Sequence, residues 1–246
     1  MTSAFRISAG ALACGASLAL SGLAQAAAVS SYGNIAAPGV YFGSGNVNGN
    51  WTVGTDTSNP VEVALRAKNR ATLATIDGSS GIYRADTGLC NPVCSGGPKA
   101  MWNYEFSVNT QAGGGSLDLT GVIVELAVDT DASAGTAFTL LNVLANWGDN
   151  SYFNGVKRVG ATPLAGEFGV QQSANPLFGN SGFGFLPGQG LYDLRLTVYS
   201  KDAQGAAGAT LAQSTIQVAV PEPSAVALTG LALLALVAAG RRRRSR

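Results

Sequence analysis

Trp102-Asn103-Tyr104-Glu105-Phe106-Ser107-Val108 alternates apolar and polar side chains without interruption. Successive side chains of a β-strand point to opposite faces of the sheet, so this pattern is typical of a strand with one buried face. The same period of two appears at residues 61–68, 122–128 and 192–198, and Ile216, Val218 and Val220 mark a last strand. Weaker strands are expected at 39–42, 51–53, 82–85 and 137–141.

Turn signals such as Asn48-Gly49, Asp77-Gly78 and Asn154-Gly155 separate these segments, and no convincing amphipathic helix lies among them. About seven to ten short antiparallel strands over this length are typical of a β-sandwich. We therefore predict an all-β fold for residues 27–219, an antiparallel β-sandwich of immunoglobulin-like or jelly-roll type. Its last hairpin is expected to join 192–200 to 211–220.

The composition fits this prediction and argues against several functions. Glycine is abundant (33 residues), charged residues make up 12% of the chain, and histidine is absent. The absence of histidine removes the commonest general base and the commonest metal ligand. Residues 27–219 carry nine basic side chains against 13 acidic ones, a net charge of −4. A net negative charge is unlike the basic surface patch that is typical of nucleic-acid-binding proteins.

The N-terminal residues have the three parts of a secretory signal peptide. Arg6 is followed by an apolar run at 9–23 and then by Ala24-Gln25-Ala26, a small-x-small cleavage site. We predict a signal helix in residues 1–26, with cleavage determined by Ala24 and Ala26. The alternatives, an N-terminal anchor or a lipoprotein modified at Cys14, fit less well, because the apolar run is short and Leu12 is misplaced for a lipobox.

The C-terminal residues also divide into three parts. Pro221-Glu222-Pro223 precedes an apolar run at 225–240, and a basic block of Arg241, Arg242, Arg243 and Arg244 follows. The run predicts a transmembrane helix, at the short end for a bilayer core of about 30 Å. The arginines are expected to stay on the cytoplasmic side. The two prolines should keep the preceding tripeptide extended.

This tail, residues 220–246, resembles the PEP-CTERM sorting signal. The resemblance implies a Gram-negative bacterium that makes exopolysaccharide, and an exosortase that acts at or near Pro221, Glu222 and Pro223. It also implies anchoring in the inner membrane before the protein reaches the cell surface or the medium. The alternative is an ordinary single-span anchor. The central segments around 39–45 and 102–108 also resemble other PEP-CTERM proteins, with no activity implied.

Cys90 and Cys94 lie in a loop rich in proline and glycine, Gly88 to Pro98. Export would place them in an oxidising compartment, so we expect a disulfide between them. A zinc site would need about two further soft ligands, and we predict no metal site.

Three other patterns allow both a functional and a structural interpretation. Residues 129–135 place oxygen ligands at alternate positions, as a calcium loop does, but a solvated turn is favoured. Phe168, Phe178, Phe183 and Phe185 lie in a glycine-rich stretch at 160–190 that is expected to form a loop, and we expect them to cap the core rather than bind a ligand. Arg66, Lys68, Arg70 and Glu62 share one strand face that suits an anionic polysaccharide, although a solvated face is the favoured interpretation.

We find no catalytic constellation in the sequence. The Gly-x-Ser-x-Gly elbow of serine hydrolases is absent. A glycosidase needs two carboxylates, and of Glu62, Glu105, Glu125 and Glu167 all but the last are expected on outward strand positions. We predict a non-catalytic exported protein without cofactor, associated with exopolysaccharide or biofilm matrix. The alternative is a secreted polysaccharide-active enzyme, a glycoside hydrolase or lyase. The expected partners are an exosortase and extracellular polysaccharide, and no nucleic acid.

Overall fold

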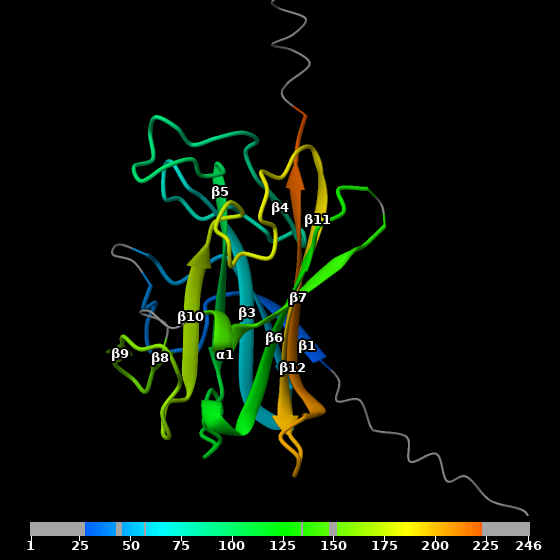
Figure 1. The fold of residues 1–246 in the computed structure, drawn as a ribbon. Helices are drawn as coiled ribbons and strands as arrows, with labels where there is room; N and C mark the ends of the chain where they lie inside the picture. Colours follow the sequence, from blue (N-terminus) through cyan, green and yellow to red (C-terminus); the bar gives the residue numbers. More distant parts are fainter. Residues whose placement is uncertain (1–27, 43–45, 57, 134, 148–151, 223–246) are drawn as a thin grey trace, which may run out of the picture.

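The structure, a computed structural model, describes residues 28–42, 46–56, 58–133, 135–147 and 152–222. They form two β-sheets with little helix (Figure 1). In spatial order the seven-stranded sheet contains β1 (Ala28–Gly33), β2 (Trp51–Asp56), β3 (Asn59–Asn69), β5 (Trp102–Asn109), β10 (Gly169–Ala174), β8 (Tyr152–Phe153) and β9 (Lys157–Arg158). The five-stranded sheet contains β4 (Ile82–Arg84), β12 (Ala207–Val220), β11 (Gly190–Lys201), β6 (Val122–Asp129) and β7 (Phe138–Asn142).

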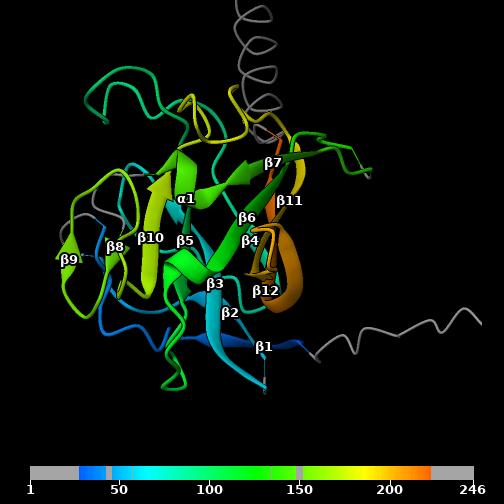
Figure 2. The ribbon, with the colours of Figure 1, turned by 60° about the horizontal axis from the view of Figure 1, so that its bottom comes forward.

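Two short helical turns complete the described fold. The 3-10 helix η1 (Leu119–Gly121) leads into β6, and the helix α1 (Val143–Asn146) follows β7. Each begins at a side-chain cap, because Asp118 accepts a hydrogen bond from the backbone N–H of Thr120 and Asn142 accepts one from that of Ala145. In Figure 2, β9, β8 and β10 lie on one side of the molecule and β6, β11 and β12 on the other.

The two sheets share one hydrophobic core between their inner faces. The alternation along β5 buries Trp102, Tyr104, Phe106 and Val108, and the five-stranded sheet contributes its own alternating residues, among them Val124, Leu126, Leu194, Leu196, Ile216 and Val218. Burial of this much apolar surface is the main stabilising contribution to such a fold. The pattern in the sequence therefore identifies the residues that hold the two sheets together.

The main strand predictions are confirmed. The segments predicted at 61–68, 102–108, 122–128 and 192–198 correspond to β3, β5, β6 and β11, and three of the weaker ones to β2, β4 and β7. The last hairpin also forms, with Leu194 opposite Ile216 in an antiparallel register. One pairing departs from the antiparallel prediction, because β4 runs parallel to β12.

Two predictions about local structure are wrong. Residues 39–42 form no strand, because their polar backbone groups bond to side chains of the seven-stranded sheet rather than to a neighbouring strand. Conversely, the stretch 160–190 contains β10, which pairs with β5 along its whole length. Strand β1 was not predicted either, and its sequence Ala-Val-Ser-Ser-Tyr-Gly carries little apolar periodicity.

The outer face of the seven-stranded sheet is covered by residues 34–42 and 46–50, here called the covering segment. Its buried side chains Ile35, Ala37 and Phe42 join Trp51, Val53, Ala64 and Phe153 in a second hydrophobic cluster. The sheet is therefore buried on both faces along part of its length. This second layer determines the environment of the polar side chains described below.

The predicted signal helix with Ala24 and Ala26, the membrane span at 225–240, Pro223 and Arg241 to Arg244 lie outside the described residues. Within the described ranges, no helix has the length and the apolar character needed to cross a membrane.

Candidate functional site

Two cations of the predicted row, Arg66 and Lys68 on β3, are buried rather than solvated, which corrects the sequence-based interpretation, whereas Arg70 follows the strand and is half-buried. Arg66 is 0% exposed, Lys68 is 6% exposed and Glu62 is 5% exposed. All three point to the outer face of the seven-stranded sheet, as their positions in the strand predict. The covering segment lies over that face and removes them from solvent. Because a buried charge is costly unless it is paired, each of these side chains needs a partner.

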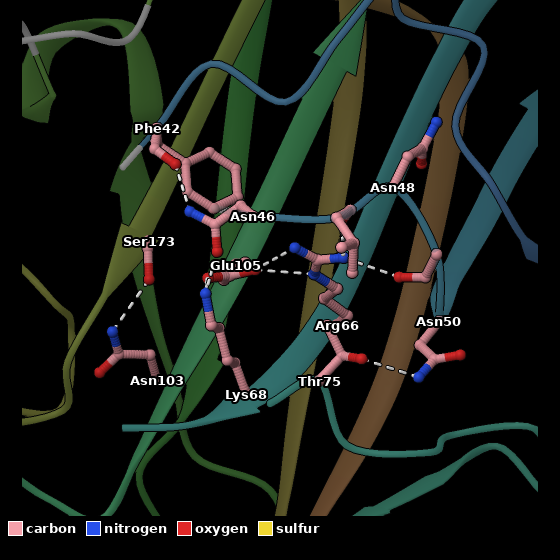
Figure 3. Close-up of polar contacts among 12 residues, drawn as sticks. Phe42, Asn46, Asn48, Asn50, Arg66, Lys68, Thr75, Asn103, Glu105 and Ser173 are labelled. Atoms are coloured by element: carbon pink, nitrogen blue, oxygen red, sulfur yellow. Dashed lines mark hydrogen bonds and ion pairs between the residues drawn. The ribbon is translucent and has the colours of Figure 1, made fainter. Parts of the chain in front are cut away.

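Arg66 obtains its partners from β5 and from the covering segment. Its Nη2 lies 2.7 Å from Glu105 Oε2, and its Nε donates to the same oxygen at 2.7 Å. Its Nη1 donates to the carbonyl oxygens of Val47 (2.9 Å) and Gly49 (2.7 Å), and the guanidinium lies 4.0 Å from the centre of a ring of Trp51. The planar fork of arginine thus joins the strand pair to the covering segment (Figure 3).

Lys68 approaches the same carboxylate from the other side. Its Nζ lies 3.7 Å from Glu105 Oε1 and also donates to Asn46 Oδ1. Burial lowers the pKa of Lys68, although the negative charge of Glu105 partly opposes that shift. In Figure 3 Arg66 and Lys68, both from β3, converge on Glu105 from β5. One carboxylate therefore faces two cations.

A groove of about 420 Å³ opens beside Lys68 on the outer face, and Phe42 and Asn46 of the covering segment line one part of it. Polar side chains from several segments line it: Asn46, Lys68, Arg70, Asn103, Glu105 and Ser173. Asn103 Nδ2 donates to Ser173 Oγ at 2.9 Å across β5 and β10. Leu73 and Val93 also line the groove. The groove combines positive charge, amide and hydroxyl groups, and apolar side chains.

The predicted disulfide between Cys90 and Cys94 is present, and it lies beside this groove. The two Cα atoms are 5.4 Å apart, and the backbone N–H of Cys94 donates to the carbonyl of Cys90 at 2.9 Å. Cys90 is buried, whereas Cys94 contributes to the lining of the groove. The bridge therefore shapes one wall of the groove.

The glutamates considered for glycoside hydrolysis are held by structural partners, and two of them are more buried than predicted. Glu105 is fully buried in the ion pair with Arg66. Glu62 accepts hydrogen bonds from the backbone N–H of Ala36 at 3.0 and 2.9 Å, and burial raises its pKa. Glu167 pairs with Arg158, and Glu125 is half-buried in β6. Glu105, Glu62 and Glu167 thus each stabilise a loop or a strand contact.

The stretch 129–135 forms a turn in which aspartate side chains accept hydrogen bonds from nearby backbone N–H groups. Asp129 Oδ1 accepts hydrogen bonds from the N–H groups of Asp131 (3.0 Å) and Ala137 (2.8 Å), and Asp131 Oδ1 accepts one from that of Ser133 (2.9 Å). These are the local bonds of Asx turns. In the part of the chain that the structure describes, no three histidine, cysteine or acidic side chains lie close enough to hold a metal ion.

Of the four phenylalanines in the glycine-rich stretch, Phe183 caps the main core as predicted. It is 6% exposed and its ring packs against Trp102, Tyr104 and Tyr192. Phe168 packs against Phe153 of the second cluster. Phe178 and Phe185 remain more than a third exposed.

The predicted sorting motif begins where the last strand ends. Strand β12 ends at Val220, and Pro221 and Glu222 are both exposed. Gln189 Nε2 donates to Glu222 Oε1 at 2.8 Å.

Comparisons of the chain with protein-family models, with curated proteins and with solved structures found no match.

Sequence reasoning did not identify the groove as a site. It singled out Arg66, Lys68 and Arg70, but it missed Asn46, Asn103 and Ser173, which come from three separate segments. The amide-rich run Asn46-Val47-Asn48-Gly49-Asn50 is the one local signal that could have drawn attention to the covering segment.

Proposed function

We propose that this chain is an exported surface protein that an exosortase sorts through residues 220–246, and that its β-domain associates non-catalytically with extracellular polysaccharide. The observation that carries the sorting part is the position of the tripeptide. Strand β12 ends at Val220 with no linker before Pro221, and the exposed Pro221 and Glu222 lie at the surface. A processing enzyme requires such an accessible, extended peptide.

Two features of the chain favour an extended conformation of the motif at this point. Proline has no backbone N–H, so Pro221 cannot continue the β-ladder beyond Val220. Pro223 restricts Glu222 to extended conformations, because a residue before proline is disfavoured in the helical region. The contact from Gln189 is exposed and leaves Glu222 at the surface.

The disulfide supports export of the β-domain. Cys90–Cys94 is the kind of bridge that forms and persists in oxidising compartments, and it is rare in the cytosol. A signal peptide at residues 1–26 and a disulfide-bonded domain are therefore consistent with each other. Mass analysis of the exported protein should find an N-terminus at Ala27 or Val29.

The environment of the glutamates supports a non-catalytic role. Glu62, Glu105 and Glu167 are engaged by backbone N–H groups or by arginines that hold the fold together. A glycosidase requires a carboxylate pair free to act on a bound sugar.

The long final hairpin and the two packed sheets also support a sandwich of immunoglobulin-like or jelly-roll type, which stays a prediction.

The sorting proposal is tested by replacing Pro221, Glu222 and Pro223 together with alanine. The apolar run and the arginines stay intact, so membrane insertion should persist while processing fails. The full-length protein should then accumulate in the inner membrane, as detected by fractionation and mass analysis. Ser224→Ala is the matched control and should be processed normally. If the triple variant reaches the outside with the same C-terminus as the wild type, the motif is not what the sorting enzyme reads.

A further inference from the structure

The groove beside Lys68 is electropositive although the domain around it is acidic. Its lining contains Lys68, Arg70 and one carboxylate, Glu105, and that carboxylate is already paired with the buried Arg66. Residues 27–219 as a whole carry a net charge of −4. A local positive potential inside a concave, partly desolvated site favours an anionic ligand.

Arg70 has hydrogen-bonding capacity that the described part of the protein does not use. Its Nε is buried and, among the described residues, has no hydrogen-bond partner. Arg70 is half-buried and lines the groove, and among the described residues its side chain forms no ion pair. The charge of its guanidinium is therefore not neutralised there, and a carboxylate matches the geometry of a guanidinium well.

The remaining lining suits a sugar ring. Ser173 and Asn46 are partly exposed and supply hydroxyl and amide groups that can hydrogen-bond to sugar hydroxyls, whereas Asn103 is 3% exposed and donates to Ser173. Leu73 and Val93 at the rim are 56% and 71% exposed, and they offer apolar contact for the C–H face of a ring. The volume of about 420 Å³ lies within the range of small-ligand sites.

Leu73 lies in the tight turn that follows β3. Its φ angle of 61° belongs to that turn, which is closed by a hydrogen bond of 2.9 Å from the backbone N–H of Asn69 to the carbonyl of Ala74. The turn leaves the apolar side chain of Leu73 exposed beside the groove.

We propose that this groove binds a carboxylate-bearing sugar residue, a uronate, of an acidic polysaccharide. The carboxylate lies at Arg70 and Lys68, hydroxyls bond to Asn46 and Ser173, and Leu73 and Val93 contact the ring. This inference rests on the proposed function, because it names the chemical class of the polysaccharide. It places recognition at the end of β3 and β5, at Lys68 and Arg70, rather than at the fully buried Arg66.

The test is isothermal titration calorimetry of the full chain, purified in detergent, with galacturonate oligomers. Methyl-esterified oligomers of the same length are the ligand control, because they keep the hydroxyls and lose the charge. Loss of a charge-assisted hydrogen bond should weaken binding at least about tenfold, both for the ester and for Arg70→Gln. Arg84→Gln removes an exposed cation outside the groove and should leave the affinity within about twofold.

A second variant keeps the test decisive if Arg70→Gln does not fold. Ala71→Asp adds a carboxylate to the groove lining without removing a side-chain contact, and it should weaken binding by repulsion. Circular dichroism and thermal unfolding establish that each variant is folded.

Three results would overturn the inference, and each is distinct from failure of the sorting proposal. Equal binding of acidic and esterified oligomers would show that the sugar is not recognised by its carboxylate, although association with polysaccharide would stand. Wild-type binding that is unchanged in Arg70→Gln and Ala71→Asp would place the site elsewhere. Binding of neither oligomer would exclude this ligand class at the groove, whatever the outcome of the Pro221, Glu222 and Pro223 replacement.

Discussion

Arg66 Nη2 and Glu105 Oε2 lie 2.7 Å apart on the outer face of the seven-stranded sheet, and both side chains are inaccessible to solvent. The two residues are also direct neighbours in the register of β3 and β5. Because Arg66 also donates to Val47 and Gly49, this ion pair connects the sheet to the segment that covers it. It is therefore one of the contacts that hold the second layer, together with the bonds of Glu62 to Ala36 and of Gln171 to Gly39 and Tyr41.

Removing one member of this ion pair should be strongly destabilising. Glu105→Leu leaves the guanidinium of Arg66 buried with one carboxylate fewer, and we expect a loss of about 3–5 kcal/mol in the free energy of unfolding. The double variant Arg66→Met/Glu105→Leu should regain most of that loss, because no unpaired arginine remains. Urea unfolding followed by tryptophan fluorescence measures both. A cost below about 1 kcal/mol for Glu105→Leu would contradict a buried pair.

Gly54 marks a point where the two sheets approach closely. A Cβ atom built at Gly54 in β2 would lie 1.8 Å from the carbonyl oxygen of Gln213 in β12, so neither backbone can accommodate it without moving. Gly54→Ala should therefore cost more than about 2 kcal/mol in thermal or urea unfolding. Gly179→Ala is the matched control, because a Cβ there meets nothing within 4 Å. Equal stability of the two variants would show that the sheets are further apart.

Glu62 should make the stability of the domain depend on pH. Burial raises its pKa above the ordinary value of 4.5, so above pH 4.5 the folded protein keeps a proton that the unfolded chain has lost. The contribution of Glu62 to stability is therefore complete below pH 4.5 and is lost as pH rises through the raised pKa.

The comparison with Glu62→Gln isolates this contribution. Glutamine can still accept the hydrogen bond from Ala36 but cannot ionise, so the variant should lose less stability than the wild type as pH rises from 4 to about 7. Urea unfolding at several pH values measures the difference. Parallel pH profiles for the two proteins would show that Glu62 does not titrate in this range.

The disulfide should stabilise the domain modestly, because the loop it closes is short. Loop-entropy scaling predicts about 2 kcal/mol for the pair of replacements Cys90→Ser and Cys94→Ser. Thiol labelling of the denatured, unreduced exported protein should be negative, and it should become positive after reduction. Stoichiometric labelling without reduction would instead show free thiols.

The strand positions were predictable because alternation is a local property. A half-buried strand needs an apolar side chain at every second position, so residues 102–108 and 192–198 indicate β5 and β11 without reference to any other part of the chain. Strands β1 and β10 lack that signal. In β10, the side chain of Gln171 is fully buried and forms hydrogen bonds with the backbone of Gly39 and Tyr41. The sequence alone does not distinguish a buried glutamine from an exposed one.

The sequence by itself determined most of the strands that form the core and that Cys90 has Cys94 as a partner, and it predicts a signal at each end of the chain. Only the tertiary structure decided that Arg66, Lys68 and Glu105 are buried, because a distant segment covers them through backbone carbonyls that any residues could supply. It also assembled the groove from Lys68, Arg70, Asn103 and Ser173, which lie on different strands and loops. The alternation of apolar residues indicates which face of a single strand packs on the core, whereas a site depends on what the rest of the chain places over the other face.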